Sequence, residues 1–391
     1  MAGSLKPMEL ACSEDPWDAA VIGAGPAGSM AARDLAAAGA RVLLVDRRAF
    51  PRDKVCGGCL NGQALAILRS AGLGDLPWRV GGRALGSFRL GVARRSVRLD
   101  LPAGMVVSRS RFDAELVATA VAAGATFLPG IEAEVGAIDG AFRRVRLGRA
   151  GNERTVRSRV VLLATGLGSP GLRDGLTPRT RVAAGSRVGA ACLIGRGVER
   201  YEAGMIHMAV GKVGYVGLVI QDGGALHVAA ALDPGECRRL GGPGAAAAEV
   251  LAEAGLPALD ELTTARWRGT PGLTWRTRPL ADERLFILGD AAGYVEPFTG
   301  EGIAWALASA RAVAGPALDA IERWDVRLVG EWARRHARVV GRRQAICRAA
   351  AAVLRRPWLV RVACEVVSAL PGSARRLVEC LNAPPCFPEM S

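Results

Sequence analysis

The sequence is poor in histidine, tyrosine and lysine, with only three of each among 391 residues. His207, His227 and His336 are far apart, and the CxxC formed by Cys56 and Cys59 has no second pair at zinc-ligand spacing. We therefore expect no metal site. The nine cysteines follow no framework spacing, so we expect reduced thiols rather than disulfides.

Long hydrophobic runs are also missing. No stretch approaches the ~18–20 uninterrupted apolar residues that a membrane span needs. Residues 1–17 do not combine a basic start with an apolar run, so they do not resemble a secretory signal. Half of the residues are hydrophobic and 23% are charged, which is typical of a folded globular protein. We expect a cytoplasmic protein of two or three domains.

The positive charge comes almost entirely from arginine. The net charge is +14, and the three lysines stand against 48 arginines, a bias typical of genome composition. Three interpretations of the basic C-terminal stretch stay open: a solvated helix face, peripheral contact with an anionic membrane, or nucleic-acid binding. We expect no nucleic acid, because no recognition motif accompanies the charge. The arginines of this stretch are Arg334, Arg335, Arg338, Arg342, Arg343, Arg348, Arg355, Arg356 and Arg361.

Near the N-terminus, a glycine-rich GAGPAG segment follows a short apolar strand and opens an alanine-rich helix. Its glycines allow a tight turn, close approach of a pyrophosphate and close helix–strand packing, and the helix N-terminus attracts phosphate. Asp46 ends the next strand, where an acid accepts ribose hydroxyls and disfavours a 2′-phosphate. The segment thus predicts FAD or NAD. Its candidate binding residues are Gly23, Gly25, Pro26, Ala27, Gly28, Asp46 and Arg47.

A second glycine-rich strand–turn–helix segment covers residues 285–310. An aspartate at the end of its strand can bind the polyol of a flavin. Backbone N–H groups at the following helix can stabilise negative charge on the reduced ring. Two such segments predict that the chain folds back to hold both ends of one flavin. The candidate residues here are Gly289, Asp290, Pro297, Gly300, Glu301, Gly302 and Ile303.

The organisation follows from these segments. We predict an α/β fold (α+β overall) with a Rossmann-like FAD-binding domain assembled from residues 15–180 and 270–315. Residues 181–269 carry short β segments between glycine turns and predict an antiparallel β-sheet substrate domain. Residues 316–391 are expected to be helical.

The motif order resembles that of p-hydroxybenzoate-hydroxylase-type flavoproteins: GAGPAG, SRSRFD at 108–113, ATG at 164–166 and GDAAGYVEPFTGEGI. The PRDKVCGG loop at 51–58 is similar to that of the geranylgeranyl reductase-related branch. The resemblance covers residues 15–315 and implies FAD as cofactor. It also implies that Arg109, Thr165 and Gly166 contact FAD.

Two departures from the family patterns concern the chemistry. Thr165 stands where aromatic hydroxylases have an aspartate. Residues 214–219 (GYVGLV) keep the tyrosine of the isoprenoid-reductase YxWxFP motif but lose its other members. Neither a halogenase lysine nor a WxWxIP helix is present. With no nicotinamide domain visible, NAD(P)H or another external reductant is the expected donor.

The expected activity is reduction of a carbon–carbon double bond in an apolar, isoprenoid- or polyketide-like small molecule. The alternatives are a flavin monooxygenase that uses O2, and a membrane-associated flavin-binding protein without turnover. Cys56 and Tyr215 are the candidate catalytic residues. If the PRDKVCGG loop passes over the flavin, the Cys56 thiol can donate a proton; its other interpretation is a small residue that fits a crowded loop.

Overall fold

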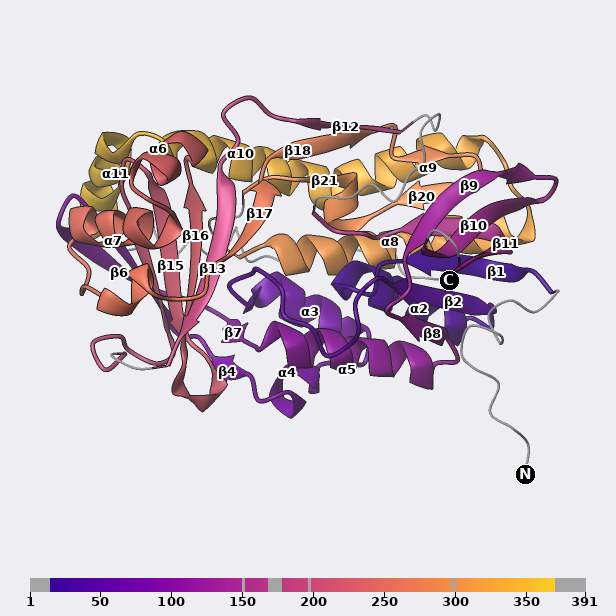
Figure 1. Cartoon of the computed structure of the whole chain (residues 1–391), viewed down its shortest axis with the longest axis horizontal. Coiled ribbons are helices and arrows are strands. Elements are labelled where there is room, and N and C mark those ends of the chain that lie inside the picture. The colour runs from indigo at the N-terminus through magenta and orange to yellow at the C-terminus, as the bar shows by residue number, and fades with distance from the viewer. Residues whose placement is uncertain are drawn as a thin grey trace.

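The computed structural model describes residues 15–149, 152–167, 178–195, 198–296, 298 and 300–369. The molecule is elongated, with one large sheet at each end (Figure 1). The C-terminal helices run along one long edge from the first sheet to the second. This arrangement leaves the centre of the molecule between the two sheets for the site.

The first sheet has the strand order β19-β20-β11-β1-β2-β8, and β10 and β9 extend it from β11. The strands β20, β11, β1, β2 and β8 run parallel. Their apolar side chains are buried because helices cover the sheet. The strands are β1 (Trp17–Ile22), β2 (Val42–Asp46), β8 (Thr126–Pro129), β9 (Ala133–Asp139), β10 (Phe142–Arg149), β11 (Asn152–Leu163), β19 (Ala281–Asp282) and β20 (Leu285–Ile287).

The predicted strand–helix–strand unit at the N-terminus is β1, α2 (Pro26–Ala37) and β2. Proline at the first helical position suits the helix start, because its missing N–H would have no partner there. Gly23 has φ +103°, and a Cβ at Gly28 would collide with the Gly23 carbonyl oxygen. Only glycine fits at these two points, so the motif is required by the turn itself.

The second sheet has the order β17-β13-β16-β15-β14-β5-β6 and is antiparallel except where β14 pairs with β5. Strands β13, β14, β15 and β16 confirm the short antiparallel segments predicted within residues 181–269. However, β5 and β6 come from the N-terminal part of the chain, so this sheet crosses the expected domain boundary at 180. The strands are β5 (Ser87–Val92), β6 (Arg95–Asp100), β13 (Val188–Ile194), β14 (Met205–Val210), β15 (Gly214–Ile220), β16 (Leu226–Leu232) and β17 (Arg268–Gly272).

Helix α7 (Pro243–Ala254) covers the outer face of the second sheet, where Val250 and Leu251 pack against Val216 and Val228. The inner face of the sheet is thereby directed towards the first sheet (Figure 1). Two three-stranded sheets join these parts: β12 (Arg179–Val182), β18 (Trp275–Arg278) and β21 (Gly293–Tyr294), and β3 (Cys59–Asn61), β7 (Gly104–Val106) and β4 (Arg83–Ala84).

Helix α6 packs against α7 beside the second sheet, and the other remaining helices lie around the first sheet and along the long edge (Figure 1). Trp332 is fully buried and its Nε1–H donates to the Ile287 carbonyl at 3.0 Å, which fixes α9 to β20. Among the residues described, no helix has the length and apolar character to cross a bilayer. The helices are α3 (Gly62–Ser70), α4 (Leu76–Arg79), α5 (Arg109–Ala122), α6 (Pro234–Arg239), α8 (Gly302–Glu322), α9 (Arg327–His336), α10 (Arg342–Leu354) and α11 (Pro357–Ala369), with a π-helical turn at Ala337–Gly341.

Candidate active site

The two glycine-rich segments meet at the carboxyl edge of the first sheet. Strands β1, β11 and β20 are parallel neighbours, so the residues that follow them gather at one edge. A Cβ at Gly289 would lie 2.7 Å from the Ala27 Cβ, and the Gly289 N–H donates to Ser309 Oγ at 2.9 Å. The chain therefore folds back as predicted, and the second segment lies directly on the first helix turn of α2.

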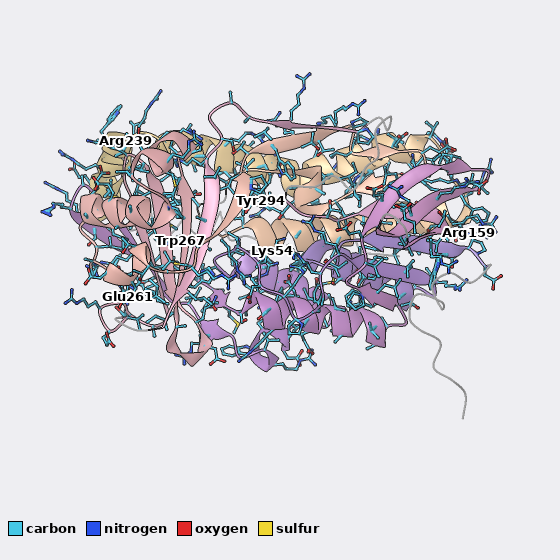
Figure 2. All side chains as sticks on the ribbon, in the orientation of Figure 1. Lys54, Arg159, Arg239, Glu261, Trp267 and Tyr294 are labelled. Atoms are coloured by element: carbon cyan, nitrogen blue, oxygen red, sulfur yellow. The ribbon has the colours of Figure 1, made fainter. Side chains whose placement is uncertain are left out.

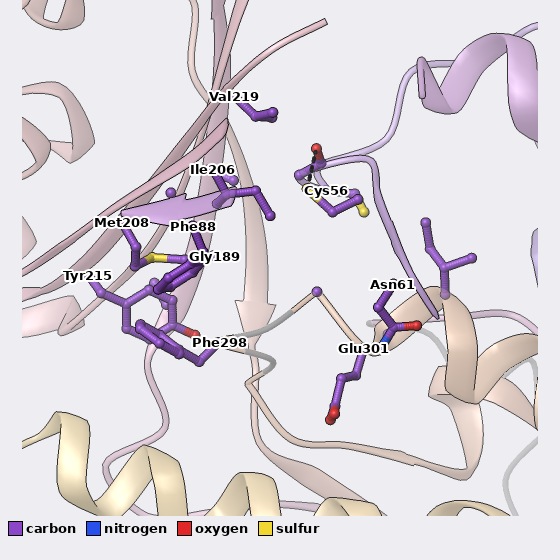
Figure 3. Close-up of a pocket in the computed structure, with 18 of the residues that line it drawn as sticks. Cys56, Asn61, Phe88, Gly189, Ile206, Met208, Tyr215, Val219, Phe298 and Glu301 are labelled. Atoms are coloured by element: carbon purple, nitrogen blue, oxygen red, sulfur yellow. Dashed lines mark hydrogen bonds between the residues drawn. The ribbon is translucent and has the colours of Figure 1, made fainter. Parts of the chain in front are cut away.

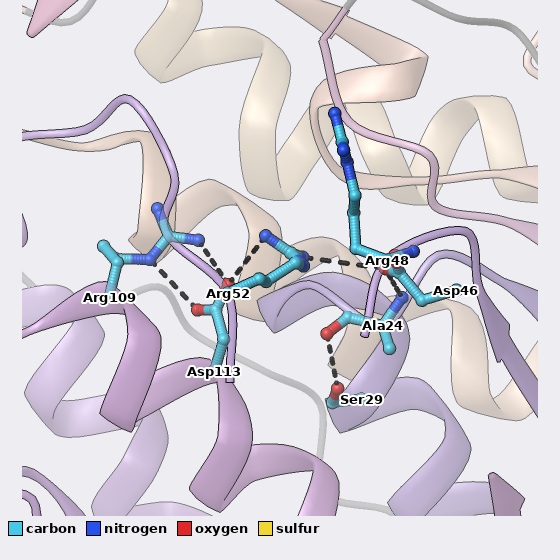
Figure 4. A network of polar contacts seen from close by, with 7 residues as sticks. All are labelled: Ala24, Ser29, Asp46, Arg48, Arg52, Arg109 and Asp113. Atoms are coloured by element: carbon cyan, nitrogen blue, oxygen red, sulfur yellow. Dashed lines mark hydrogen bonds and ion pairs between the residues drawn. The ribbon is translucent and has the colours of Figure 1, made fainter. Parts of the chain in front are cut away.

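A row of charged side chains runs along the loop that follows β2 (Figure 4). Asp46 accepts hydrogen bonds from the backbone N–H groups of Ala24 (2.8 Å) and Arg48 (2.9 Å). Arg52 lies 3.6 Å from the Asp46 carboxylate and 3.4 Å from that of Asp113. Asp46 thus also orders the glycine loop, a role that the sequence did not indicate, while Arg47 is exposed at the end of β2.

The residues of this edge fit the phosphates and polyol of FAD. If Gly25 carried a Cβ, the nearest side-chain or backbone atom would be Arg52 Nη2, at 3.6 Å. The Gly25 backbone is therefore accessible to a ligand, and the Arg52 guanidinium lies next to it. Arg52 Nε and Thr165 Oγ1 are buried polar atoms without a hydrogen-bond partner. Buried donors are normally paired, and a pyrophosphate at the N-terminus of α2 would supply acceptors for them. Arg52 was not among the predicted ligands, although it lies in the PRDKVCGG loop.

Arg109 and Asp113 form a buried ion pair on α5, with distances of 3.0 and 2.9 Å. Burial acts to lower the pKa of Arg109, but the Asp113 carboxylate and then Cys56 outweigh it and raise that pKa. The Cys56 side chain therefore lies close enough to the Arg109 guanidinium to affect its pKa. Arg109 therefore connects the first glycine region to the cysteine loop.

Lys54 and Asp290, both half-buried, form a second charged group. Figure 2 places Lys54 and Tyr294 at the centre of the molecule. Burial lowers the pKa of Lys54 and Asp290 raises it in part; burial also raises the pKa of Asp290, which Lys54 lowers in part. A Cβ at Gly166, where φ is +73°, would lie 3.2 Å from Lys54 Nζ. Sequence reasoning missed Lys54, although its place in the PRDKVCGG loop among only three lysines was a usable signal.

The start of α8 closes the site. Gly300 has φ +74° and approaches Cys59, and a Cβ at Gly302 would lie 3.1 Å from the Tyr294 hydroxyl. Ile303 is buried and lines the adjoining cavity. These positions present backbone to the site, whereas Pro297 lies outside the described residues.

The side chain of Glu301 contacts helix α10. The Cys347 thiol of α10 donates a hydrogen bond to its carboxylate at 2.6 Å. Burial raises the pKa of Glu301, and the Cys347 bond lowers it in part. One oxygen of its carboxyl group is therefore engaged with α10, while Glu301 also lines the adjoining cavity.

A cavity of about 490 Å³ opens beside these charged groups. Its walls are mostly apolar and come from the second sheet and from the C-terminal helices. Figure 3 places Phe88, Met208, Tyr215 and Phe298 at one side and Cys56 at the other. The lining residues from α10 and α11 are Ala350, Val353, Leu354, Val360, Ala363 and Cys364.

The two predicted catalytic residues both line this cavity, but on different walls. Tyr215 packs edge-on against Phe298 at 5.3 Å, and Arg187 lies over its ring. Burial and then Glu296 raise the pKa of Tyr215, so the phenol stays protonated.

Cys56 is half-buried and accepts from the Gly58 N–H at 3.5 Å. Cys59 behind it is also a free thiol, and burial raises its pKa to about 12. The two side chains differ in that Cys56 reaches Arg109, whereas Cys59 donates to the Gly57 carbonyl at 3.6 Å. Of the two thiols, Cys56 is the one placed at the charged end of the cavity.

Comparisons with known proteins agree with this geometry. Residues 17–176 match the FAD binding domain family. The menaquinone reductase of Mycobacterium tuberculosis is 36% identical over 163 residues, 40% of this chain and 39% of its own length. The chain thus matches about two fifths of that relative. Digeranylgeranylglycerophospholipid reductase 1 of Methanopyrus kandleri is 30% identical over 333 residues, 79% of this chain and 82% of its own.

Solved structures show the same fold. The flavin-dependent brominase Bmp2 has a TM-score of 0.77 at 18% identity over 94% of each chain. The myxobacterial chondrochloren halogenase CndH has a TM-score of 0.74 at 20% identity, covering 95% of this chain and 94% of its own. Taken with the long match to the Methanopyrus reductase, the chain belongs to the family of FAD-dependent oxidoreductases that includes the digeranylgeranylglycerophospholipid reductases.

Proposed function

We propose that this enzyme reduces a carbon–carbon double bond in an apolar, isoprenoid-like small molecule. The observation that carries the proposal is the cavity, whose apolar walls end at Cys56, Arg109 and Asp290. Its volume lies within the roughly 300–1,000 Å³ range of small-molecule sites. Two relatives are named for reactions on a lipid or a quinone, the digeranylgeranylglycerophospholipid reductase and the menaquinone reductase, and they support this substrate class.

Bound FAD would supply the hydride (two electrons and one proton) for one carbon of the double bond, after reduction by an external donor such as NAD(P)H. The backbone N–H groups at the start of α8, near Gly302, stabilise negative charge on the bound cofactor. Lys54 places a cation close to the same region. These are the groups that would hold the cofactor beside the cavity.

The second carbon needs a proton, and Cys56 is the proposed donor. Its S–H bond breaks as the carbon–hydrogen bond forms, and the remaining thiolate lies against the Arg109 guanidinium. Tyr215 on the opposite wall orients the substrate through its hydroxyl rather than through proton transfer.

A flavin monooxygenase is the second candidate. The observation that favours it is the stretch Gly214–Ile220 (β15), which forms a cavity wall without the Trp and Phe-Pro of the isoprenoid-reductase motif. The same cavity would then hold a substrate that gains an oxygen atom.

Single-turnover product analysis separates the two candidates. The purified holoenzyme is photoreduced without oxygen and mixed with a polyprenyl quinone or a geranylgeranyl lipid. A product that gains two hydrogen atoms across a carbon–carbon double bond of the prenyl chain supports the proposed reduction, whereas a quinol with its prenyl chain unchanged contradicts it. A product that forms only after oxygen is admitted, and gains one oxygen atom, contradicts it.

The cysteine assignment is tested with a matched pair of variants. Cys56→Ser is expected to keep its FAD and to lose turnover by about 10²-fold or more, the usual range for general acids. Cys59→Ser, two glycines away, is expected to keep most of its activity. Equal turnover in both variants would remove Cys56 from the mechanism.

A further inference from the structure

The C-terminal helices expose an apolar surface. Half of the exposed large hydrophobic side chains of the described residues lie on α10 and α11, although these helices form a small part of the chain. Trp358 is 64% exposed. We call this surface the docking face; its residues are Ile346, Val353, Trp358, Val362 and Val366.

The docking face results from helical spacing. Trp358, Val362 and Val366 recur every four residues on α11, which places them on one side of the helix. The other side of α11 carries Val360 and Cys364, which are buried and line the cavity. The helix is therefore apolar towards the core and towards solvent, a pattern that packing among the described residues does not require.

Positive charge surrounds the docking face. Arg342, Arg356 and Arg361 are all exposed on or between α10 and α11. Glu365 is the one acidic residue between positions 342 and 369, and Arg361 and Arg95 pair with it at 3.3 and 3.5 Å. An apolar stripe flanked by arginines complements a bilayer with anionic headgroups, which attracts basic residues and accepts apolar side chains.

The cavity reaches the surface at the same place. Val353 lines the cavity and is also 39% exposed, so it belongs to the cavity wall and to the docking face. Ala350 and Ala363, its neighbours on α10 and α11, line the cavity and are exposed as well. The opening of the cavity therefore lies within the surface that the arginines surround.

We propose that this surface docks on an anionic phospholipid bilayer and brings the cavity opening against the lipid. An apolar substrate then passes from the bilayer into the cavity without exposing its apolar surface to water. The docking rests on the surface alone, and only the passage of substrate rests on the proposed function.

Vesicle flotation without substrate tests the docking, so its result does not depend on the reaction. The full-length holoenzyme is mixed with phosphatidylcholine vesicles with or without phosphatidylglycerol. We expect binding to the anionic vesicles and at least tenfold weaker binding to the neutral ones. The triple variant Trp358→Ala, Val362→Ser, Val366→Ser is expected to lose at least tenfold in affinity. It should keep its FAD absorbance, because none of these residues lines the cavity.

Charge and position are tested with two further variants. Arg342→Gln combined with Arg356→Gln is expected to weaken binding to anionic vesicles while leaving FAD content unchanged. Trp78→Ala is the control, because Trp78 is 59% exposed on α4 at the opposite edge of the molecule. It should bind like the unaltered protein.

Three results would overturn the proposal. The first is equal vesicle binding by the unaltered protein and the triple variant. The second is no binding by the unaltered protein at all. The third is a triple variant that still binds vesicles but has a lower molar mass in solution than the unaltered protein, as measured by light scattering. That result would show that the docking face contacts a second copy of the chain.

Discussion

The contact between the two glycine-rich segments can be tested at Gly289, where a single methyl group can separate them. In Gly289→Ala the new Cβ would lie 2.7 Å from the Ala27 Cβ, whereas ordinary contact begins at 3.4 Å. The segments would have to move apart by 3.4 − 2.7 = 0.7 Å. Such overpacking costs about 1–3 kcal/mol. The left-handed backbone at Gly289 (φ +60°) costs alanine a further ~1–2 kcal/mol.

Matched variants isolate the contact. Gly72→Ala has a similar backbone penalty, since its φ is +72°, but nothing lies within 4 Å of its Cβ. We expect Gly289→Ala to lower the free energy of unfolding in urea by about 1–3 kcal/mol more than Gly72→Ala, and to lose FAD. Adding Ala27→Gly to Gly289→Ala should restore most of the difference. Equal effects of the two single variants, with no rescue, would refute the contact.

Two further predictions concern buried groups. Cys347→Ala removes the thiol bonded to Glu301 and is expected to lower the free energy of unfolding by about 1–3 kcal/mol, because a buried carboxyl group loses its partner. Cys237→Ala, at a half-buried thiol, should lower the free energy of unfolding by less. A larger loss for Cys237→Ala in urea unfolding would contradict the role given to the Cys347–Glu301 hydrogen bond. Burial and then Arg109 lower the pKa of His227 from 6.5 to about 4, so the unfolded chain binds more protons between these values. Stability should therefore fall as pH drops from 6.5 towards 4, by up to about 3 kcal/mol from this residue. His227→Gln should flatten that slope, and an unchanged slope would count against it.

The parts of the fold that could be predicted are those with local signals. An apolar strand, a glycine turn and a helix follow one another within residues 17–37, and each depends on neighbours in sequence. The same holds for the strand and turn that carry Asp290. Parallel strands then bring both segments to one edge, so the cofactor site follows from local patterns and one topological rule.

The cavity could not be predicted in this way. Strand β5 pairs in parallel with β14, more than a hundred positions later, and no local pattern marks such a partner. Gln344 on α10 donates to the Gly293 carbonyl at 2.9 Å, and this contact helps to hold the C-terminal helices over the site. Alanine-rich helices give little information on where they pack, because many of their faces are equally apolar.

The most direct test of the central claim, that an apolar substrate meets the reduced flavin in this cavity, is reoxidation of the reduced enzyme by substrate. Gly217 lines the cavity, and the nearest atoms to a Cβ there belong to the flexible end of Met208. Gly217→Phe should fill the cavity, keep its FAD and resist anaerobic reoxidation by a polyprenyl substrate, while oxygen still reoxidises it. The unaltered enzyme and Gly217→Ala should be reoxidised by both. Equal reoxidation of Gly217→Phe by the polyprenyl substrate would contradict the account.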